Sequence, residues 1–202
     1  MGSTMTQGRF ATLSGQTRRA GQAGFSLVEV LFAGAIMTIG LLAVLGMFTT
    51  ALTAAQSSQL DQIAHARATQ ALESVYTARQ TAQLGFDAIN PVGTTTNGTL
   101  GIFTTGMATM TDPGPDGLDG TADDVPTAPI VLPGPDGKLG TADDQTISLA
   151  NFQRQIQISL AVDPNTGAQI PTLKQIVVTI QYQTSNGITR SYQVQSLISQ
   201  YR

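Results

Sequence analysis

One apolar segment near the N-terminus constrains the fold more than any other feature of the sequence. No charged residue lies between Val30 and Ala55, a run of 26 residues. A helix of that length is about 39 Å long, whereas the hydrocarbon core of a bilayer is about 30 Å thick. The mean hydropathy of the whole chain is only +0.06, so the apolar residues are concentrated in this segment. The sequence predicts a single membrane-spanning helix followed by a polar domain, and it excludes a protein that crosses the membrane many times.

The residues on either side of the start of this segment are unusual for a simple anchor. Residues 1–24 carry three arginines and no acidic residue, which is typical of a cytoplasmic leader. The small residue Gly24 precedes the apolar segment, whereas a secretory signal peptide is cleaved after its apolar segment. Glu29 lies at the head of the run, and a carboxylate in hydrocarbon costs about 2.5–3.5 kcal/mol. We therefore expect Glu29 either to reach the interface or to find a partner.

The residues from Gly24 to Leu31, GFSLVEVL, resemble the N-terminal signature of type IV pilins and type II secretion pseudopilins. The resemblance rests on the basic leader, the Gly-Phe pair, a glutamate at the fifth position after the glycine, and the long apolar helix. It implies that a prepilin peptidase cleaves between Gly24 and Phe25 and that Phe25 becomes N-methylated. Residues 39–46 are most similar to minor pilins of the PilV type.

The resemblance also implies a role for Glu29 and a set of partners. Cleavage creates an ammonium group on Phe25, which Glu29 of a neighbouring subunit would bind through a charge-assisted hydrogen bond in a medium of low dielectric. A pair within one chain is the alternative, because four residues are about one helical turn. The implied partners are other pilin subunits, the prepilin peptidase and the inner-membrane assembly platform of the pilus. The implied location is the inner membrane before assembly, and then an extracellular filament, or the periplasm for a pseudopilin.

The helix is predicted to continue beyond the membrane. No Pro or Gly interrupts residues 47–84, and Gly85 is a plausible stop. We expect one helix of about 55–60 residues, with residues 25–54 serving the membrane and assembly and residues 55–84 packing against a globular head. The apolar side of this second part follows three- and four-residue spacing: Leu60, Ile63, Ala64, Ala68, Ala71, Leu72, Val75 and Tyr76.

Residues 85–146 are predicted to be mainly loops, and they contain an internal repeat. Asp112–Asp124 and Leu132–Asp144 are identical at ten of thirteen positions. Tight turns of Asp, Gly and Pro direct several oxygens inward, and Ca²⁺ takes six to eight oxygen ligands. The sequence therefore predicts calcium binding, with a richer ligand set in the first copy; a solvated acidic loop whose carboxylates cap turns is the alternative. The candidate ligands are Asp112, Asp116, Asp119, Asp123, Asp124, Asp136, Asp143 and Asp144.

Residues 147–202 are predicted to form three antiparallel strands. Apolar and polar residues alternate in three runs, which is typical of half-buried strands. Asn186-Gly187 indicates a hairpin between the last two runs, and residues 164–167 begin a longer connection between the first two. The expected fold class is α+β, a pilin fold in which the long N-terminal helix covers the apolar face of an antiparallel sheet. Tyr182 and Tyr192 are expected to pack in the core or across strands.

Composition excludes several classes of function. The chain has no cysteine and one histidine, His65, so zinc–thiolate and multi-histidine centres are excluded. The net charge is −3, no basic patch for nucleic acid is evident, and no catalytic motif is present, so we expect no enzymatic activity. The expected function is that of a minor pilin-like structural subunit of a type IV pilus. The alternatives are a type II secretion pseudopilin and a membrane-anchored calcium-binding surface module that does not assemble.

Overall fold

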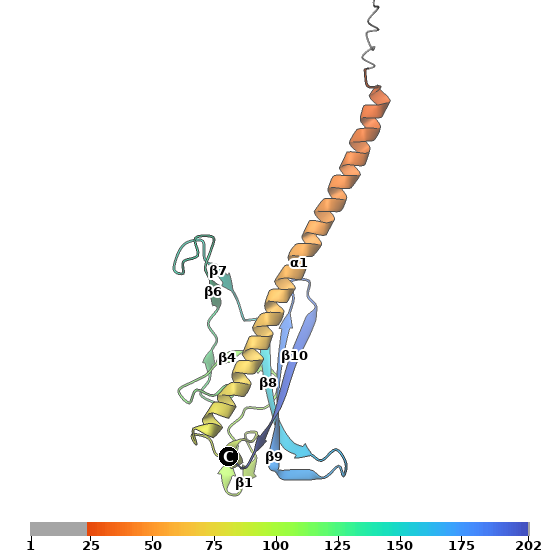
Figure 1. Cartoon of the computed structure of the whole chain (residues 1–202). Helices are drawn as coiled ribbons and strands as arrows, with labels where there is room; N and C mark the ends of the chain where they lie inside the picture. Colours follow the sequence, from red (N-terminus) through yellow and green to blue (C-terminus); the bar gives the residue numbers. More distant parts are fainter. Residues whose placement is uncertain (1–23, 202) are drawn as a thin grey trace, which may run out of the picture. The chain divides into compact units, whose positions relative to one another are not determined.

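The computed structural model describes residues 24–201 of the chain (Figure 1). The chain divides into two compact units, Met1–Phe48 and Thr49–Arg202. Apart from Gly24, the predicted leader lies outside the described residues. The single helix α1, Leu27–Gln80, contributes to both units. One long helix together with antiparallel sheets confirms the predicted α+β class.

The end of α1 differs slightly from the prediction. The helix stops at Gln80 rather than at residue 84, because Ala82 adopts a left-handed φ of 62°. The Leu84 N–H then bonds to the Ala78 carbonyl at 2.9 Å, which satisfies one of the free carbonyls at the helix end. Gly85 was the expected stop, since glycine usually takes this conformation, but an alanine three residues earlier takes it here.

Every described residue of the first unit, residues 24–48, is exposed. The apolar part of α1 is long enough and apolar enough to cross a membrane. The side chain of Phe25 is 82% exposed, and the three glycines of this part of the helix, Gly34, Gly40 and Gly46, have no other atom within 4 Å of the position that a Cβ would take. Within residues 24–201, therefore, nothing covers this surface.

The second unit contains a four-stranded antiparallel sheet in the order β10-β9-β8-β3. The predicted meander is present as β8 (Phe152–Val162), β9 (Gln169–Gln183) and β10 (Thr189–Ser199). The turn at residues 184–188 contains the Asn-Gly pair, with Gly187 at a φ of 76°. The fourth strand, β3 (Ala108–Thr109), pairs with β8 and comes from the region predicted as loops. A two-residue strand carries too little alternation to be recognised from the sequence.

The region of residues 85–146 is therefore less irregular than predicted. Beside β3 it holds a 3₁₀ turn and three small antiparallel strand pairs, β1–β2, β4–β5 and β6–β7. The bounds are η1 Phe86–Ala88, β1 Thr95–Thr96, β2 Thr99–Leu100, β4 Thr111–Asp112, β5 Val125–Pro126, β6 Ile130–Leu132 and β7 Gln145–Ile147.

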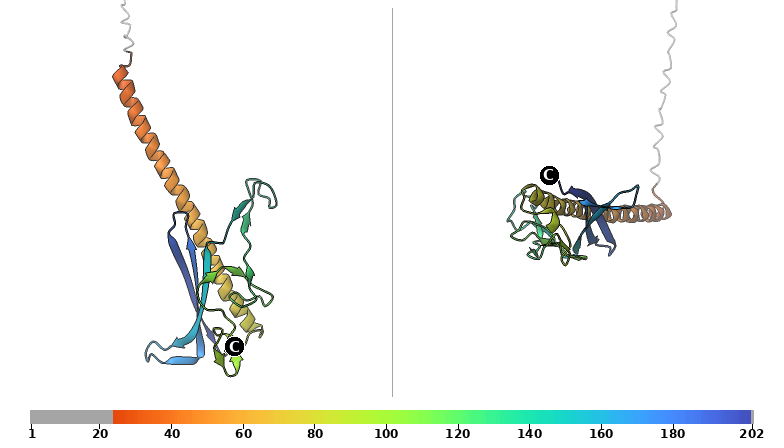
Figure 2. Two further views of the ribbon diagram at one scale, coloured as in Figure 1. Left: turned by 180° about the vertical axis from the view of Figure 1, so that it is seen from behind. Right: turned by 90° about the horizontal axis from the view of Figure 1, so that it is seen from below.

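The core of the second unit lies between α1 and the inner face of the sheet, whose blue strands run alongside the yellow part of the helix (Figures 1 and 2). All eight residues of the predicted apolar stripe are buried or packed against this core. Tyr182 is 1% exposed and stacks on Phe152, with ring centroids 5.2 Å apart. His65 is exposed, as expected, and its ring centroid lies 5.1 Å from that of Tyr192.

Candidate functional sites: the exposed helix and the duplicated aspartate loops

The predicted processing and assembly residues all lie on the exposed first unit. Gly24 and Phe25 precede the helix, and Glu29 lies in its first turn. No ion pair within residues 24–201 involves Glu29. In the uncleaved chain the Phe25 nitrogen belongs to a peptide bond, so neither of the two predicted pairings exists before cleavage. These three residues lie close together at the start of the helix, and their roles stay predictions from the sequence.

Each copy of the aspartate repeat folds as a loop between two short strands, and hydrogen bonds within the loop hold its shape. The repeat's threonine hydroxyl donates to the aspartate two residues later at 2.7 Å in both copies. The N–H of the third glycine donates to the last aspartate at 2.8 and 2.6 Å, and the first shared aspartate accepts from the N–H two residues later at 2.8 and 2.9 Å. The aspartates concerned are Asp116, Asp123 and Asp124 in the first copy and Asp136, Asp143 and Asp144 in the second.

The copies differ at three positions, and the first copy uses all three to contact the rest of the second unit. Asp112 pairs with Arg67 of α1 at 3.0 Å. Leu118 is 3% exposed and belongs to the core. Asp119, 1% exposed, pairs with Arg154 of β8. The docking of the first copy therefore depends on the residues that the second copy lacks.

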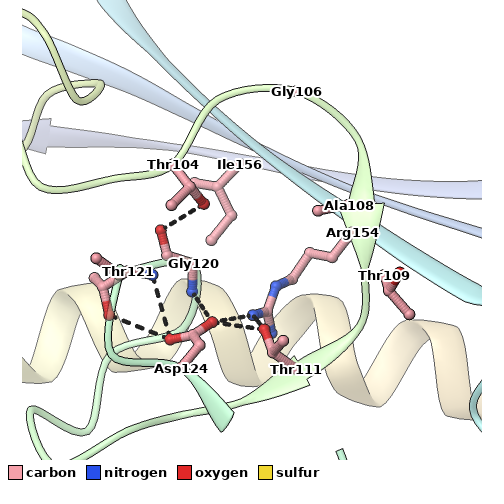
Figure 3. A pocket seen from close by; sticks show the side chains of 11 residues that line it. Thr104, Gly106, Ala108, Thr109, Thr111, Gly120, Thr121, Asp124, Arg154 and Ile156 are labelled. Carbon is pink, nitrogen blue, oxygen red and sulfur yellow. Dashed lines mark hydrogen bonds and ion pairs between the residues drawn. The ribbon is translucent and has the colours of Figure 1, made fainter. Parts of the chain in front are cut away.

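Arg154 is the centre of this docking. Its guanidinium reaches from β8 to the Asp124 carboxylate and to the Thr111 hydroxyl, both at 2.9 Å (Figure 3). It also pairs with Asp119, so two buried carboxylates share one cation and the three groups carry a net charge of −1. A pocket of about 270 Å³ lies beside them. The arrangement joins the loop region to the sheet through charge, in addition to the apolar contact of Leu118 with the core.

Asp119 is the least satisfied member of the cluster. Its Oδ2 is buried and has no hydrogen-bond partner. Burial raises the pKa of Asp119 above its ordinary value of 3.8, against the opposing effect of Arg154. In both loops, by contrast, the threonine hydroxyl holds the pKa of the fully exposed aspartates Asp123 and Asp143 below the ordinary value.

The second copy makes no comparable contacts. The residues at the three differing positions are Leu132, Lys138 and Leu139, of which Lys138 and Leu139 are exposed. Lys138 takes part in no ion pair among the described residues. The β6–β7 hairpin and its loop stand away from the sheet in Figures 1 and 2. Among the described residues, the second copy is thus a folded loop whose Lys138 and Leu139 make no ion pair and no core contact.

The predicted calcium ligands fall into these two loops, but the loops do not form a cage of oxygens. Within residues 24–201 no group of three or more Asp, Glu or His side chains is arranged to hold a metal ion. The carboxylates accept hydrogen bonds from N–H and hydroxyl groups, and the two extra acids of the first copy, Asp112 and Asp119, are paired with arginines. Ca²⁺ needs six to eight oxygens, so these carboxylates would have to give up some of their present hydrogen bonds to bind it. Calcium binding stays a prediction from the sequence.

Sequence reasoning missed the buried cations of the head. Arg154 occupies an inward-facing position between Phe152 and Ile156, and Lys174 alternates in phase with Ile176. This phase was a usable signal, because every second residue of a strand faces the core. The Lys174 ammonium donates to the Phe86 and Ile89 carbonyls at 2.8 and 2.9 Å, and burial lowers its pKa.

A further polar contact joins α1 to the sheet. Asp61 accepts a hydrogen bond from the Tyr182 hydroxyl and pairs with Arg190 at 3.0 Å. Together with Arg67, it shows that the polar side of the helix also contacts the head.

Comparison with protein-family models, with curated proteins and with solved structures gives no match for this chain. What the structure supports is therefore one long apolar N-terminal helix with a β-sheet head, an arrangement compatible with a pilin fold.

Proposed function

We propose that this chain is a structural subunit of a type IV pilus, a minor pilin of the PilV type. In this proposal the prepilin peptidase removes the leader between Gly24 and Phe25, and the assembly platform moves the subunit from the inner membrane into a filament. The observation that carries the proposal is the contrast within α1. Residues 27–48 are entirely exposed, whereas the later part of the helix contributes five buried residues to the core of a folded head.

An exposed apolar surface of this size needs a cover. Sixteen large apolar side chains between Phe25 and Leu52 are exposed, far more than a soluble monomer carries in one place. A bilayer covers them before assembly, and the helices of neighbouring subunits would cover them in a filament. Gly34, Gly40 and Gly46 support this second state, because small residues let packed apolar helices approach closely.

Glu29 gives this packing a register. A lone carboxylate is costly in an apolar helix bundle, and the ammonium group created on Phe25 would neutralise it. Pairing between neighbours favours one axial offset and disfavours others, since each misplaced subunit leaves two unpaired charges. Repetition of one such offset is a heterologous contact that does not close, and it generates a helical filament.

The decisive experiment is N-terminal analysis of the mature protein by mass spectrometry. The expected first residue is an N-methylated Phe25. The Glu29→Ala variant should be cleaved and inserted normally but recovered in filaments at about one tenth of the wild-type level or less, which corresponds to about 1.4 kcal/mol. Gln59→Ala, an exposed polar change on the same helix, is the matched control and should assemble normally.

Two outcomes would contradict the proposal. A mature chain that begins at Met1 would support a tethered surface module that does not assemble. Normal incorporation of Glu29→Ala would remove this carboxylate from the assembly mechanism. Fractionation then separates the two filament types: recovery in sheared surface fibres supports a pilus, and confinement to the periplasm supports a type II secretion pseudopilin.

A further inference from the structure

The exposed tip of the second repeat carries two residues that make no ion pair and no core contact among residues 24–201. The tip is defined here as Lys138 and Leu139. In the first copy the same two positions are Leu118 and Asp119, and both are inserted into the head at 3% and 1% exposure. The loop framework is the same in the two copies. In the first copy these two positions are therefore among those at which the loop contacts another surface.

The chain offers a surface of the opposite charge. A groove of about 380 Å³ lies between α1 and the first copy, and three acids but no base line it: Glu73, Asp116 and Asp119. The Gln83 side chain holds one wall in place by donating to the Asp116 carbonyl at 2.8 Å. Asp119, which pairs with Arg154, adds a buried Oδ2 that has no hydrogen-bond partner among residues 24–201. A cation with a short apolar neighbour would suit this groove, which also includes Ala78 and Pro113.

We infer that the tip of one subunit docks in the acidic groove of a second copy of this chain. The Lys138 ammonium would face the groove carboxylates, and Leu139 would contact the small apolar residues beside them. The inference rests on the proposed function, because a filament would bring two heads of this chain side by side wherever two copies of it are neighbours. It adds a specific contact between heads to the contact between N-terminal helices. Charge complementarity selects the occupant. Lys138 is the only base among residues 112–144, and all the charged residues that line the groove are acids.

The lysine content of the chain makes a direct test possible. The chain has two lysines, Lys138 and Lys174, and Lys174 is 2% exposed. A water-soluble carbodiimide joins an ammonium group to a carboxylate only where the two groups touch. We propose to treat filaments made from equal parts of ¹⁴N- and ¹⁵N-labelled full chain, or the full chain concentrated in detergent micelles if it does not enter filaments. Mass spectrometry then shows whether a link joins a light chain to a heavy one.

The expected result is a mixed light–heavy link from Lys138 to Glu73 or Asp116. Lys138→Arg should abolish the link while leaving assembly unchanged, because a guanidinium keeps the charge but does not react. Lys138→Glu should lower the recovery of the chain in filaments several-fold, and adding Glu73→Lys to it should restore both recovery and a mixed link. The exposed Gln153→Glu change on the outer face of the sheet is the control for added negative charge.

Cysteine pairing tests the same contact without relying on charge, since the natural chain has no cysteine. Full chains carrying Lys138→Cys and Glu73→Cys should form at least tenfold more mixed disulfide than chains carrying Gln153→Cys and Glu73→Cys. Three outcomes would overturn the inference: links only within one chain, equal disulfide yields for the two pairs, or a link from Lys138 to a different protein. Lysine-dependent binding of the chain to vesicles of anionic lipid, without a mixed link, would also overturn it and assign the tip to a membrane surface. All of these leave the N-terminal analysis, and hence the proposed function, unaffected.

Discussion

Leu118 and Asp119 of the first repeat are buried, whereas Lys138 and Leu139, at the same positions of the second repeat, are exposed. Ten of the thirteen residues are nevertheless identical, and the hydrogen bonds inside the two loops match in partners and closely in length. The shape of this loop is therefore determined locally, by aspartates that accept N–H groups of their own turns. Whether the loop belongs to the core depends on only three side chains.

This difference separates local from global stability in one molecule. The first copy adds a buried leucine and three ion pairs with two arginines to the fold, so a change in it should affect the whole second unit. We expect the second copy to open and close without disturbing the core, because few contacts join it to the rest of the described residues. Matched substitutions in the two copies test that separation, and the unfolding of the full chain in detergent micelles measures it.

The largest expected difference concerns the cations. Arg154→Met leaves Asp119 and Asp124 buried without a counter-charge, so we expect the free energy of unfolding to fall by about 3–5 kcal/mol. Lys138→Met removes an exposed cation without an ion pair, so we expect a change within about 0.5 kcal/mol. Denaturant unfolding of both variants provides the measurement. A small effect of Arg154→Met would mean that the cluster does not fasten the first copy to the sheet.

The next difference concerns the leucines. Leu118 is 3% exposed and Leu139 is 65% exposed. Leu118→Ala should cost about 2–5 kcal/mol, because it removes apolar contacts and leaves a cavity. Leu139→Ala should cost less than about 0.5 kcal/mol in the isolated chain. Equal losses from the two variants would show that the second copy also packs against the core.

The two copies also show which parts of the structure could be predicted from the sequence. Residues 55–80 could be assigned to the helix, with its buried face, because the stripe repeats at helical spacing over several turns. The three long strands could be assigned because they alternate over many residues, and the repeat could be found by identity alone. In each case a periodic signal extends over enough residues to exceed chance.

The docking of the first copy could not be predicted in the same way. It depends on single ion pairs, Arg67 with Asp112 and Arg154 with Asp119, which join residues 45 and 35 positions apart. A sequence alone does not show which distant charges meet. The inward phase of Arg154 was visible, but its partner was not. The extra acids of the first copy, predicted as additional calcium ligands, pair with Arg67 of α1 and Arg154 of β8.

A smaller effect is expected from the glycines that begin the two turns. A Cβ at Gly114 would lie 2.2 Å from the Asp123 carbonyl oxygen, and one at Gly134 would lie 2.3 Å from that of Asp143. Alanine should therefore strain both turns equally. Gly114→Ala should lower the free energy of unfolding by about 1–3 kcal/mol, whereas Gly134→Ala should leave it nearly unchanged and instead increase amide hydrogen exchange in residues 133–144. Global destabilisation by Gly134→Ala would break the proposed separation of the two loops.

The pH dependence of stability should change when Asp119 of the first copy is replaced. The raised pKa of Asp119 in the folded chain means that its folded form binds a proton more tightly than its unfolded form. Its contribution to stability is therefore largest below the ordinary value of 3.8 and is lost as the pH rises through the raised value. Asp119→Asn should remove this loss, so the stability of the wild type relative to the variant should decline with rising pH.

An exposed aspartate elsewhere in the chain gives a control of opposite sign. The Asn165 N–H lowers the pKa of Asp163, so the contribution of Asp163 is present above the ordinary value and is lost as the pH falls. The relative stability of the wild type against Asp163→Asn should therefore increase with rising pH. Identical pH profiles for the wild type and Asp119→Asn would show that burial does not control the ionisation of Asp119.

Calcium should produce the smallest effect, and the comparison of the copies predicts where it acts. Arg67 and Arg154 already neutralise acids of the first copy, whereas no arginine among residues 24–201 pairs with the acids of the second copy. If extracellular-type affinity applies, with a dissociation constant of about 10⁻⁴–10⁻³ M, a tenfold excess over that constant stabilises the bound state by about 1.4 kcal/mol. Calorimetric titration of the full chain measures the heat, and hydrogen exchange measures protection in residues 133–144.

The location of the response distinguishes the two loops. Asp136→Asn with Asp143→Asn should abolish both the heat and the protection, whereas Asp116→Asn with Asp123→Asn, the same pair in the first copy, should retain them. The melting temperature should hardly change, because ion binding to a loop that opens independently of the core stabilises that loop and not the sheet. A large calcium-dependent shift in melting would therefore place the ion at the first copy, where it would have to displace Arg154 from its carboxylates. The absence of heat would identify both loops as turns that carboxylates hold without metal.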